Sequence, residues 1–334
     1  MSVSVRLLSV FVLFAFVPAW ALEPVTADEA VTLLEFQIGK VTDVRATLGD
    51  VNGAPTYDIR CKAGESVVAA YVDARASRVL TVLVDGTPSY TWPGVVVVGH
   101  RGTVKFAPEN TLAGFNKAIE LGADLIEMDV RETKDGHLVI MHDVSVARTT
   151  EGRGNVAELT LEQIKSLDAG AEFDIAFKGE RVPTLAEALR AIDGRALPDI
   201  DLKAGNPRKV VDAVREAGVL GKVTLYCGDW NLLKQVLAID AGFQIRPTAP
   251  QGSPGLEKVL EEFDPPIVNI DWRYFTEGLV RAIHLKGKKA FVNTMGPEDN
   301  AASMTRAVEA GADYIQSDRL DLLVPLLRGR GLHK

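Results

Sequence analysis

Two histidines are the residues of this sequence best suited to acid–base chemistry. His100 directly follows the apolar run 95–99, and His142 directly follows the apolar run 138–141. Because histidine titrates near neutral pH, one ring can remove a proton while a second ring donates one in the same turnover. We therefore predict His100 and His142 as a catalytic pair, with a capping or surface position as the alternative for His100. The remaining histidines lack such neighbours and are predicted at the surface: His137, His284 and His333.

Three carboxylates and a lysine on two predicted strands form a second candidate cluster. Glu127 and Asp129 alternate along the apolar strand 125–130, so both side chains point to one face. Burying them unpaired is costly, and a divalent cation removes that cost. Asp201, near the end of the next barrel strand, adds a third oxygen ligand, and such ligands suit Mg²⁺ or Ca²⁺. Lys203 shares the face of Asp201, and its compact positive charge is suited to binding an anionic group such as a phosphate. A salt bridge from a neighbouring arginine is the alternative to the metal.

Other polar residues near these clusters have two possible roles. Glu109 and Asn110 precede Thr111 at the start of a predicted helix. They either shape and cap this helix or contact substrate or metal directly. Asp143 follows His142, where it either orients the imidazole ring or caps the next loop.

These side chains converge only if the elements that carry them form a suitable sheet. After Pro93, apolar strand-like runs alternate with helix-like stretches, which predicts parallel βα units and, at this length, a distorted (β/α)₈ barrel. Polar residues just beyond the carboxyl ends of barrel strands lie on the catalytic face. The predicted barrel strands are 95–99, 125–130, 199–203, 223–227, 244–248, 267–271, 290–294 and 314–317.

A ninth apolar run, 138–142, follows strand 125–130 too closely for a crossover helix. The intervening Lys134-Asp135-Gly136 predicts a tight turn, so we interpret the ninth run as the second arm of a hairpin. A two-residue turn at Asp135-Gly136 would place Asp129 directly opposite His142, with Cβ atoms about 5 Å apart. This register would bring His142 to the carboxylates, and a longer turn would shift it.

Short motifs run in a fixed order through the chain after Pro93. They are His100-Arg101-Gly102, Pro108-Glu109-Asn110-Thr111, Glu127-x-Asp129, Thr133-Lys134-Asp135-Gly136, His142-Asp143, Arg148-Thr149-Thr150-x-Gly152, Leu167-Asp168-Ala169-Gly170 and Val182-Pro183-Thr184-Leu185. Each triplet alone has low specificity, but the ordered set has high specificity. Together the motifs resemble the glycerophosphodiester phosphodiesterase family over most of this part of the chain.

The resemblance implies metal-dependent hydrolysis of glycerophosphodiesters to glycerol phosphate and an alcohol, with Mg²⁺ or Ca²⁺ as cofactor. It also implies a distorted (β/α)₈ barrel. The segment 143–181 corresponds to the family's variable insertion over the site, where Phe173 and Phe177 are expected lid residues. The implied site residues are His100 and His142 for catalysis, Glu127, Asp129 and Asp201 for the metal, and Arg101 and Lys203 for the phosphate.

Two positions depart from the family pattern. Asp201 stands where the family usually has glutamate, and its side chain is one methylene shorter, which bears on metal distance and identity. Val292-Asn293-Thr294 stands where the family usually has a Trp-Thr pair that helps to wall the substrate pocket. The exact substrate therefore stays open. A lipid phosphodiesterase of the lysophospholipase D or sphingomyelinase D type is one alternative, and a non-catalytic phospholipid-binding protein is another.

The first residues form a pattern typical of an export signal. Arg6 precedes the apolar run 7–17, and Ala19-Trp20-Ala21 provides a small-x-small cleavage pattern. We predict a signal peptide at 1–21, cleavage after Ala21, and a secreted or periplasmic protein. An uncleaved anchor is the alternative, but the run is too short for a comfortable transmembrane span.

Residues 22–92 differ in pattern from the barrel that we predict at 93–334. An apolar-periodic stretch at 27–36 predicts a helix, and alternating segments predict a small antiparallel sheet after it. These predicted strands are 40–48, 56–61, 66–72 and 80–84. The result is a small α+β domain that weakly resembles propeptide-associated modules of exported proteins.

Charge and cysteine content narrow the classes of partner. The 334 residues carry a formal net charge of −8 and no long basic run, which argues against nucleic acid or an anionic membrane as the main partner. A small phosphodiester substrate is compatible with this charge, and the oligomeric state is open. Cys61 and Cys227 are the two cysteines, and we favour two buried thiols over a disulfide.

Overall fold

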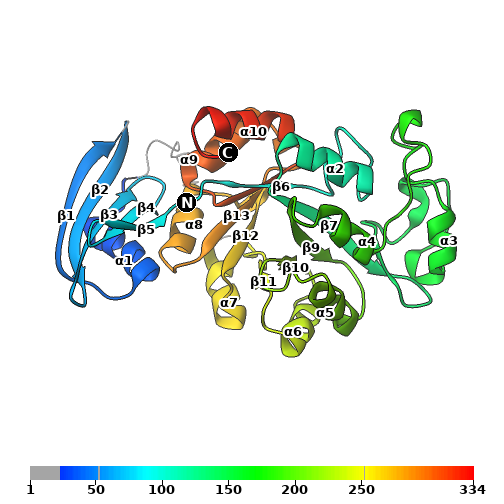
Figure 1. Cartoon of the computed structure of the whole chain (residues 1–334), viewed down its shortest axis with the longest axis horizontal. Helices are drawn as coiled ribbons and strands as arrows, with labels where there is room; N and C mark the ends of the chain where they lie inside the picture. Colours follow the sequence, from blue (N-terminus) through cyan, green and yellow to red (C-terminus); the bar gives the residue numbers. More distant parts are fainter. Residues whose placement is uncertain (1–22, 52, 252) are drawn as a thin grey trace, which may run out of the picture.

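The computed structural model describes residues 23–51, 53–251 and 253–334 of the chain. The predicted signal peptide at 1–21 lies outside the described residues. Within those ranges, no helix has both the length and the apolar character needed to cross a bilayer. Figure 1 shows a five-stranded sheet at one end of the long axis, beside a larger sheet that is surrounded by helices.

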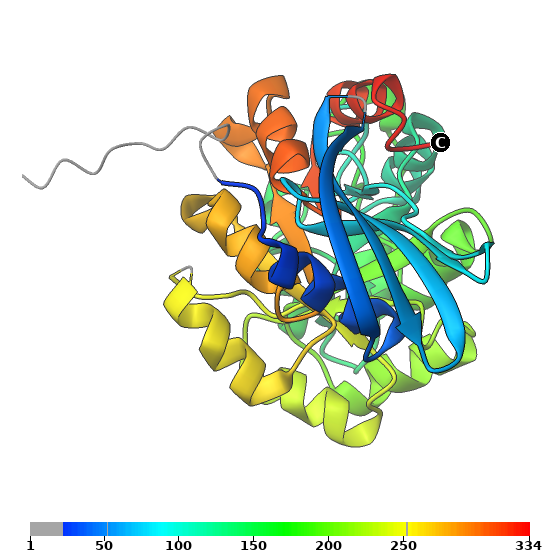
Figure 2. The ribbon, with the colours of Figure 1, turned by 90° about the vertical axis from the view of Figure 1, so that its left-hand side faces the viewer.

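The N-terminal module, residues 23–92, is one helix packed on an antiparallel sheet (Figure 2). Leu34 from the helix is fully buried against Ile59 and Val68 from the sheet. The helix and the first four strands were predicted, whereas the short fifth strand was not. The elements in order are α1 (Ala27–Ile38), β1 (Thr42–Val51), β2 (Ala54–Ala63), β3 (Ser66–Asp73), β4 (Arg78–Val84) and β5 (Thr87–Thr91).

Eight parallel strands form the barrel, which confirms the predicted fold class. They are β6 (Val96–Gly99), β7 (Leu125–Glu132), β9 (Leu197–Leu202), β10 (Thr224–Tyr226), β11 (Gln244–Ile245), β12 (Ile267–Asp271), β13 (Lys289–Asn293) and β14 (Tyr314–Ser317). Their order is β11-β10-β9-β7-β6-β14-β13-β12. An isolated bridge between Thr248 and Asn269 joins the segment after β11 to β12, and the Asn269 N–H donates to the Pro247 carbonyl at 3.0 Å. The barrel is therefore nearly closed.

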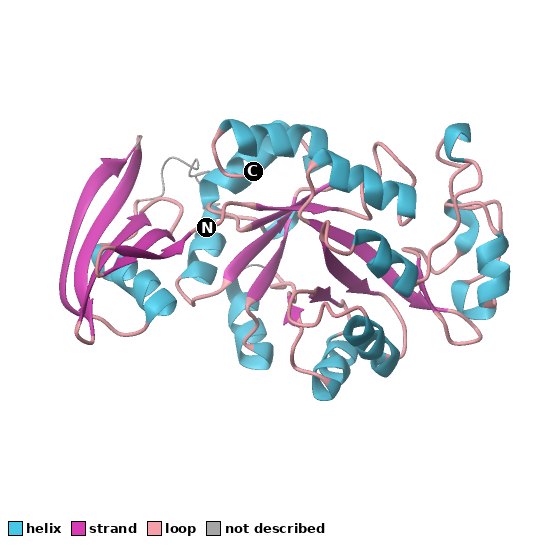
Figure 3. Cartoon of the chain, viewed as in Figure 1, coloured by secondary structure: helices cyan, strands magenta, loops and turns pink. Residues whose placement is uncertain are grey.

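Helices cover the outside of these strands (Figure 3). Each presents one apolar face to the sheet, as α4 does with Leu185, Leu189 and Ile192, which repeat at helical spacing and are buried. Thr184 and Glu187 form the capping box that starts α4. The helices are α2 (Leu112–Leu121), α4 (Leu185–Ile192), α5 (Pro207–Glu216), α6 (Trp230–Ile239), α7 (Ser253–Phe263), α8 (Glu277–His284), α9 (Ala301–Ala310) and α10 (Leu320–Gly329).

The predicted hairpin is present, but its register differs from the prediction by one residue. β8 (Leu138–Ile140) pairs antiparallel with β7, and Met141, not His142, lies opposite Asp129. The turn contains three residues, 134–136, because Gly136 adopts a φ of 81° and lengthens the predicted two-residue turn. The predicted register was therefore wrong, and His142 stands beyond the end of β8 rather than in its pairing.

The insertion between β8 and α4 has a small core of its own. Its elements are η2 (Val146–Arg148), η3 (Val156–Glu158), α3 (Leu161–Ser166) and η4 (Ile175–Phe177). Val146, Val156 and Ile164 are buried together with Met141 from the end of the hairpin. Phe173 and Phe177 contact each other edge to face, with ring centroids 5.6 Å apart.

Buried polar contacts join the module to the barrel. Ser77 Oγ lies 3.2 Å from His284 Nδ1, and His284 Nε2 lies 2.9 Å from Asp313 Oδ2. The prediction of a surface position for His284 was therefore wrong, because the N-terminal module covers this end of α8. Cys61 in the module and Cys227 in the barrel are buried free thiols, as the sequence favoured.

Candidate active site

The three predicted metal-binding acids meet at one place inside the barrel. Glu127 and Asp129 come from β7 and Asp201 from β9, and each offers an oxygen within 4.8 Å of the others. Asp129 and Asp201 are direct neighbours in the parallel pairing of these strands, so their side chains share a face. All three are buried. We call this set the carboxylate cluster.

The carboxylate cluster has a deficit of positive charge. Burial, followed by repulsion from Asp129 and Asp201, raises the pKa of Glu127 well above its usual range. Asp201 Oδ1 is buried and has no hydrogen-bond partner among the described residues, and Asp129 Oδ1 has only the ammonium group of Lys203, 3.2 Å away. Carboxylate oxygens that converge in this way, with few donors around them, fit a hard divalent cation. The donor set therefore agrees with the metal predicted from the sequence.

The two predicted phosphate ligands lie beside these acids. Lys203 Nζ is 2.6 Å from Asp201 Oδ2 and 3.2 Å from Asp129 Oδ1. Arg101 Nε is 3.4 Å from Asp129 Oδ2, and Arg101 Nη1 donates to Glu109 Oε1 at 3.0 Å. Burial raises the pKa of Asp129, but Lys203 and Arg101 outweigh it and hold that pKa below the usual range. The arginine salt bridge foreseen as the alternative thus exists, from Arg101 to Asp129, and Asp201 Oδ1 still has no hydrogen-bond partner among the described residues.

The loop after β6 is shaped around the carboxylate cluster. Arg101 and Asn110 both adopt left-handed backbone conformations, with φ of 50° and 56°. Arg101 N–H donates to Glu127 Oε2 at 2.6 Å, and Asn110 Nδ2 donates to Asp129 Oδ2 at 2.7 Å. Thr111 caps α2 instead, because its hydroxyl accepts from the Gly114 N–H. Asn110 thus orients one of the acids, and this contact stabilises a backbone conformation that is otherwise unfavourable.

His100 is held by an acid that sequence reasoning missed. Its Nδ1 lies 2.7 Å from Asp318 Oδ1, and Asp318 follows β14, the strand that pairs with β6. With Nδ1 engaged by a carboxylate, Nε2 is the nitrogen left for proton transfer. Asp318 N–H in turn donates to Asp299 Oδ2 at 2.6 Å. The available signal was the position of Asp318 just beyond a barrel strand, the same place that singled out His100.

His142 has a similar partner with a different environment. Its Nδ1 lies 2.7 Å from Asp143 Oδ1, so Asp143 orients the ring, as one of the two sequence hypotheses stated. Arg148 donates to Asp143 Oδ2 and to Glu109 Oε2, each at 2.7 Å. Arg148 is also the largest influence on the pKa of Asp143, which it holds well below the usual range. Glu109 contacts both Arg148 and Arg101, so one network links the two histidine segments.

Nearer the start of β9, the barrel interior contains a pair of opposite charges that the sequence analysis did not predict. Asp199 accepts two hydrogen bonds from the guanidinium of Arg246, each at 2.7 Å, and a third from Thr224 Oγ1 at 2.7 Å. Both charged residues are buried. We call Asp199 and Arg246 the buried ion pair. Each member supplies the charge that the other lacks, so a metal is not needed at this depth.

The position of the family's tryptophan is polar in this chain. Asn293 ends β13, and its Oδ1 is buried without a hydrogen-bond partner among the described residues.

A cavity of about 180 Å³ lies between the loop after β6 and the insertion. Glu109, Arg148, Glu172 and Phe173 are among the residues that line it. Charged and aromatic groups therefore border this cavity, and two of them, Glu109 and Arg148, belong to the network that holds Asp143.

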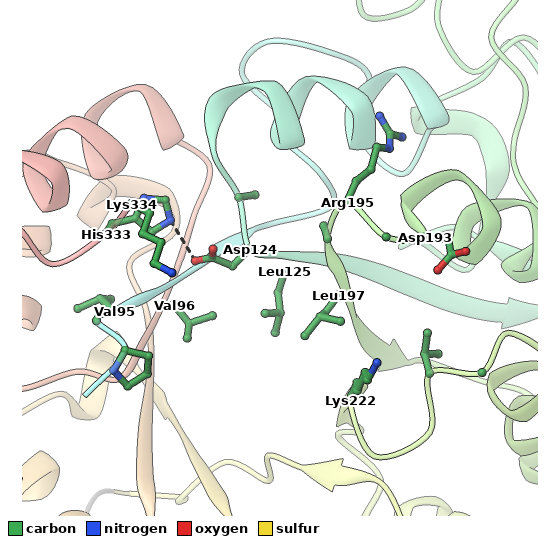
Figure 4. Close-up of a pocket in the computed structure, with 17 residues that line it drawn as sticks. Val95, Val96, Asp124, Leu125, Asp193, Arg195, Leu197, Lys222, His333 and Lys334 are labelled. Carbon is green, nitrogen blue, oxygen red and sulfur yellow. Dashed lines mark hydrogen bonds and ion pairs between the residues drawn. The ribbon is translucent and has the colours of Figure 1, made fainter. Parts of the chain in front are cut away.

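A larger cavity, of about 610 Å³, lies at the opposite end of the barrel, where the strands begin (Figure 4). Asp124 and His333 meet there at 3.1 Å, while Lys222 comes from another wall. Barrel enzymes place their chemistry where the strands end, and the carboxylate cluster does not line this cavity. We therefore place the candidate active site at the carboxyl ends of the strands.

Comparison with known proteins identifies the family. Residues 100–322 match the glycerophosphoryl diester phosphodiesterase family. A glycerophosphodiester phosphodiesterase of Caldanaerobacter subterraneus is 37% identical over 249 residues, which cover 71% of this chain and 99% of that protein.

Solved structures show the same similarity. A glycerophosphodiester phosphodiesterase from Agrobacterium tumefaciens has 35% identity and a TM-score of 0.64, and the match covers 69% of this chain and 99% of that one. An Oleispira antarctica phosphodiesterase in complex with the product sn-glycerol-3-phosphate has 25% identity and a TM-score of 0.62, over 70% and 97% of the two chains.

Proposed function

Because the chain belongs to the glycerophosphoryl diester phosphodiesterase family, we propose that it hydrolyses glycerophosphodiesters to glycerol phosphate and an alcohol by paired-histidine catalysis. The chain is a phosphodiesterase, and the proposal concerns its substrate, its metal and the roles of its residues. The observation that carries the proposal is the carboxylate cluster, in which Asp201 Oδ1 has no partner among the described residues, together with two His–Asp pairs.

Glu127, Asp129 and Asp201 are the residues that would hold a divalent cation, Mg²⁺ or Ca²⁺. Such a cation, when bound, supplies Lewis-acid polarisation of the phosphoryl group. Arg101 and Lys203 bind the nonbridging phosphate oxygens and offset their negative charge as it grows. Their present contacts with Asp129 support this role, because they already stand at the edge of the carboxylate cluster.

The two histidines move the protons. Nε2 of one ring removes a proton from the nucleophile, which is water or the neighbouring glycerol hydroxyl, as the new P–O bond forms. Nε2 of the other ring donates a proton to the alcohol oxygen as the old P–O bond breaks. Asp318 and Asp143 hold His100 and His142 through Nδ1, so that the outer nitrogen of each ring stays available.

The main test is a pair of histidine variants. His100→Ala and His142→Ala should each lower kcat by roughly 10²–10⁴ while circular dichroism and Tm stay close to wild type. Glycerophosphocholine and glycerophosphoglycerol are the substrates, each assayed with Mg²⁺, with Ca²⁺ and with chelator. Wild-type rates in either variant would reject the paired-histidine mechanism. Full activity of the wild-type protein in chelator would reject the requirement for a metal.

A second candidate function is hydrolysis of lysolipids by the same site. Phe173 and Ile175, in the insertion beside the active site, expose 41% and 73% of their surface, which gives the site an apolar border. Long-chain lysophosphatidylcholine should then be cleaved faster than glycerophosphocholine. A preference for glycerophosphocholine that is unaltered in Ile175→Ser would reject this candidate.

We also propose that the mature protein is exported. The support is the sequence pattern at 1–21, and mass spectrometry of protein expressed with its native leader should find an amino terminus at Leu22. An intact amino terminus on a membrane-associated protein would favour the anchor instead.

A further inference from the structure

His142 lies just beyond the point where the pairing of the hairpin ends. The last backbone hydrogen bond of this pairing runs from the Met141 N–H to the Asp129 carbonyl at 2.8 Å. The chain then bends at 142–144, and no backbone N–H of the described residues donates to the His142 carbonyl. The strand pairing therefore leaves the backbone of His142 unfixed, although proton transfer requires its ring to be held in position.

Arg131 supplies the missing contact. Its guanidinium donates twice to the His142 carbonyl oxygen, from Nε at 3.0 Å and from Nη2 at 2.7 Å. Hydrogen bonds from a charged donor are stronger than those between neutral groups. Arginine suits this place because its donors lie in one rigid plane, so that two of them reach the same oxygen together.

Strand β7 carries Arg131 on the same face as two members of the carboxylate cluster. Residues 127, 129 and 131 alternate along the strand with Met128 and Val130, which are fully buried. Three successive residues on one face of β7 thus provide two acids to the carboxylate cluster and a guanidinium to His142. One strand therefore sets the position of these acids relative to the backbone of His142.

The acids near Arg131 are engaged by other cations. Burial lowers the pKa of Arg131, and the charges of Asp129 and Asp143 oppose this shift. Asp129 is bound by Lys203 at 3.2 Å, however. Asp143 is bound by Arg148 at 2.7 Å. The neutral carbonyl of the bend thus remains as the acceptor for the Arg131 guanidinium.

We propose that Arg131 is a positioning residue for His142. Arg131 holds the backbone of His142, while Asp143 holds the ring through Nδ1. With the residue fixed at both places, Nε2 keeps one position relative to the carboxylate cluster. This inference rests on the proposed function, because it concerns proton transfer by His142. Arg131 itself touches no reacting atom and acts through the histidine.

The test is a double-mutant cycle between Arg131 and His142 in the full chain. Arg131→Met keeps the aliphatic stem, removes both donors, and should lower kcat on glycerophosphocholine by about 10- to 100-fold with little change in KM. In the His142→Ala background the same substitution should have no further effect on kcat, because no imidazole remains to be positioned. Arg131→Lys keeps the charge and should recover part of the loss. Arg190→Met removes an exposed arginine on α4 and is the matched control, with unchanged kcat.

The outcomes separate this inference from the proposed function. Wild-type activity of His142→Ala would overturn both. If His142→Ala is impaired and Arg131→Met is not, only the positioning role is overturned. A higher KM with unchanged kcat, or an equal loss from Arg131→Met in both backgrounds, would also overturn it, because Arg131 would then act on the substrate or on the fold. If Arg131→Met does not fold, the cycle is measured with Arg131→Lys, whose smaller loss should likewise disappear in His142→Ala.

Discussion

Two buried charged groups occupy neighbouring layers of the barrel interior, and they differ in how their charges are balanced. In the buried ion pair, both oxygens of Asp199 accept from Arg246, so each charge has its partner. In the carboxylate cluster, two residues further along β9, three acids meet, and Asp201 Oδ1 has no hydrogen-bond partner among the described residues. The charges of the buried ion pair are thus balanced by the protein itself, whereas those of the carboxylate cluster are not.

This difference separates structure from function. A buried ion pair with matched hydrogen bonds holds the barrel strands in place and needs no ligand from solution. An excess of buried negative charge is unfavourable by itself and is tolerated where a ligand supplies the missing charge. The following predictions test whether the two sites can be separated in this way.

The largest expected effect is on turnover when the carboxylate cluster loses a charge. Glu127→Gln or Asp129→Asn should lower kcat/KM by about 10³-fold, because several kcal/mol of transition-state stabilisation depend on this site. In Glu127→Gln, the free energy of unfolding in chelator should stay equal or rise, because burial and the neighbouring acids already disfavour the charge of Glu127. Steady-state kinetics and urea denaturation measure the two quantities. A large loss of stability in Glu127→Gln would erase the distinction between the sites.

The buried ion pair should show the opposite behaviour. Asp199→Asn should lower the free energy of unfolding by about 3–5 kcal/mol, because it leaves the Arg246 guanidinium buried without its counter-charge. The double variant Asp199→Leu/Arg246→Met removes both charges and should recover most of that stability, which makes it the matched control. Urea denaturation is the measurement. Wild-type stability in Asp199→Asn would mean that the pair does not hold the barrel.

Asn110 offers a smaller change that sharpens the comparison. Asn110→Gly removes the hydrogen bond to Asp129 and suits the left-handed backbone at this position. The metal concentration for half-maximal activity should rise about 10- to 100-fold, because a partner that orients a ligand is lost. Stability in chelator should change little. An unaltered metal requirement would show that Asp129 needs no such support.

The smallest effect concerns a buried acid outside both sites. Burial, with a contribution from Asp318, raises the pKa of Asp299 to about 6 from an ordinary value of 3.8. A raised carboxyl pKa in the folded state stabilises the protein below 3.8, and this contribution disappears as the pH rises through about 6. Carbon-13 NMR of the side-chain carboxyl should show a midpoint near 6. A midpoint close to 3.8 would mean that hydrogen bonds from Ser317 and Asp318 outweigh burial.

Much of the candidate site followed from local rules. Alternation along a strand was sufficient to put Glu127 and Asp129 on one face, and parallel neighbours placed Asp201 beside them. The hairpin register was missed because turn length depends on one glycine conformation, and a change of one residue moves every pair. His142 reaches the network through its contact with Asp143 instead.

Hydrogen-bond and ion-pair partners that lie far apart in the chain could not be predicted from the sequence. Asp318 and His100 are 218 residues apart and meet because β14 returns to pair with β6. Arg246 meets Asp199 across β10, so the balance of charge inside the barrel depends on which strands become neighbours. Nothing local distinguishes these side chains from other charged residues near strand ends.

The sequence by itself determined the strands, the helices between them and the acids that face inward, because these follow from periods of two and 3.6 residues. The tertiary structure decided which charges are balanced and which are not, from the paired Asp199 and Arg246 to the three acids that meet at the carboxylate cluster. The physical reason is that electrostatic balance depends on distances of a few ångströms between segments far apart in the chain. Those distances exist only once the barrel has closed.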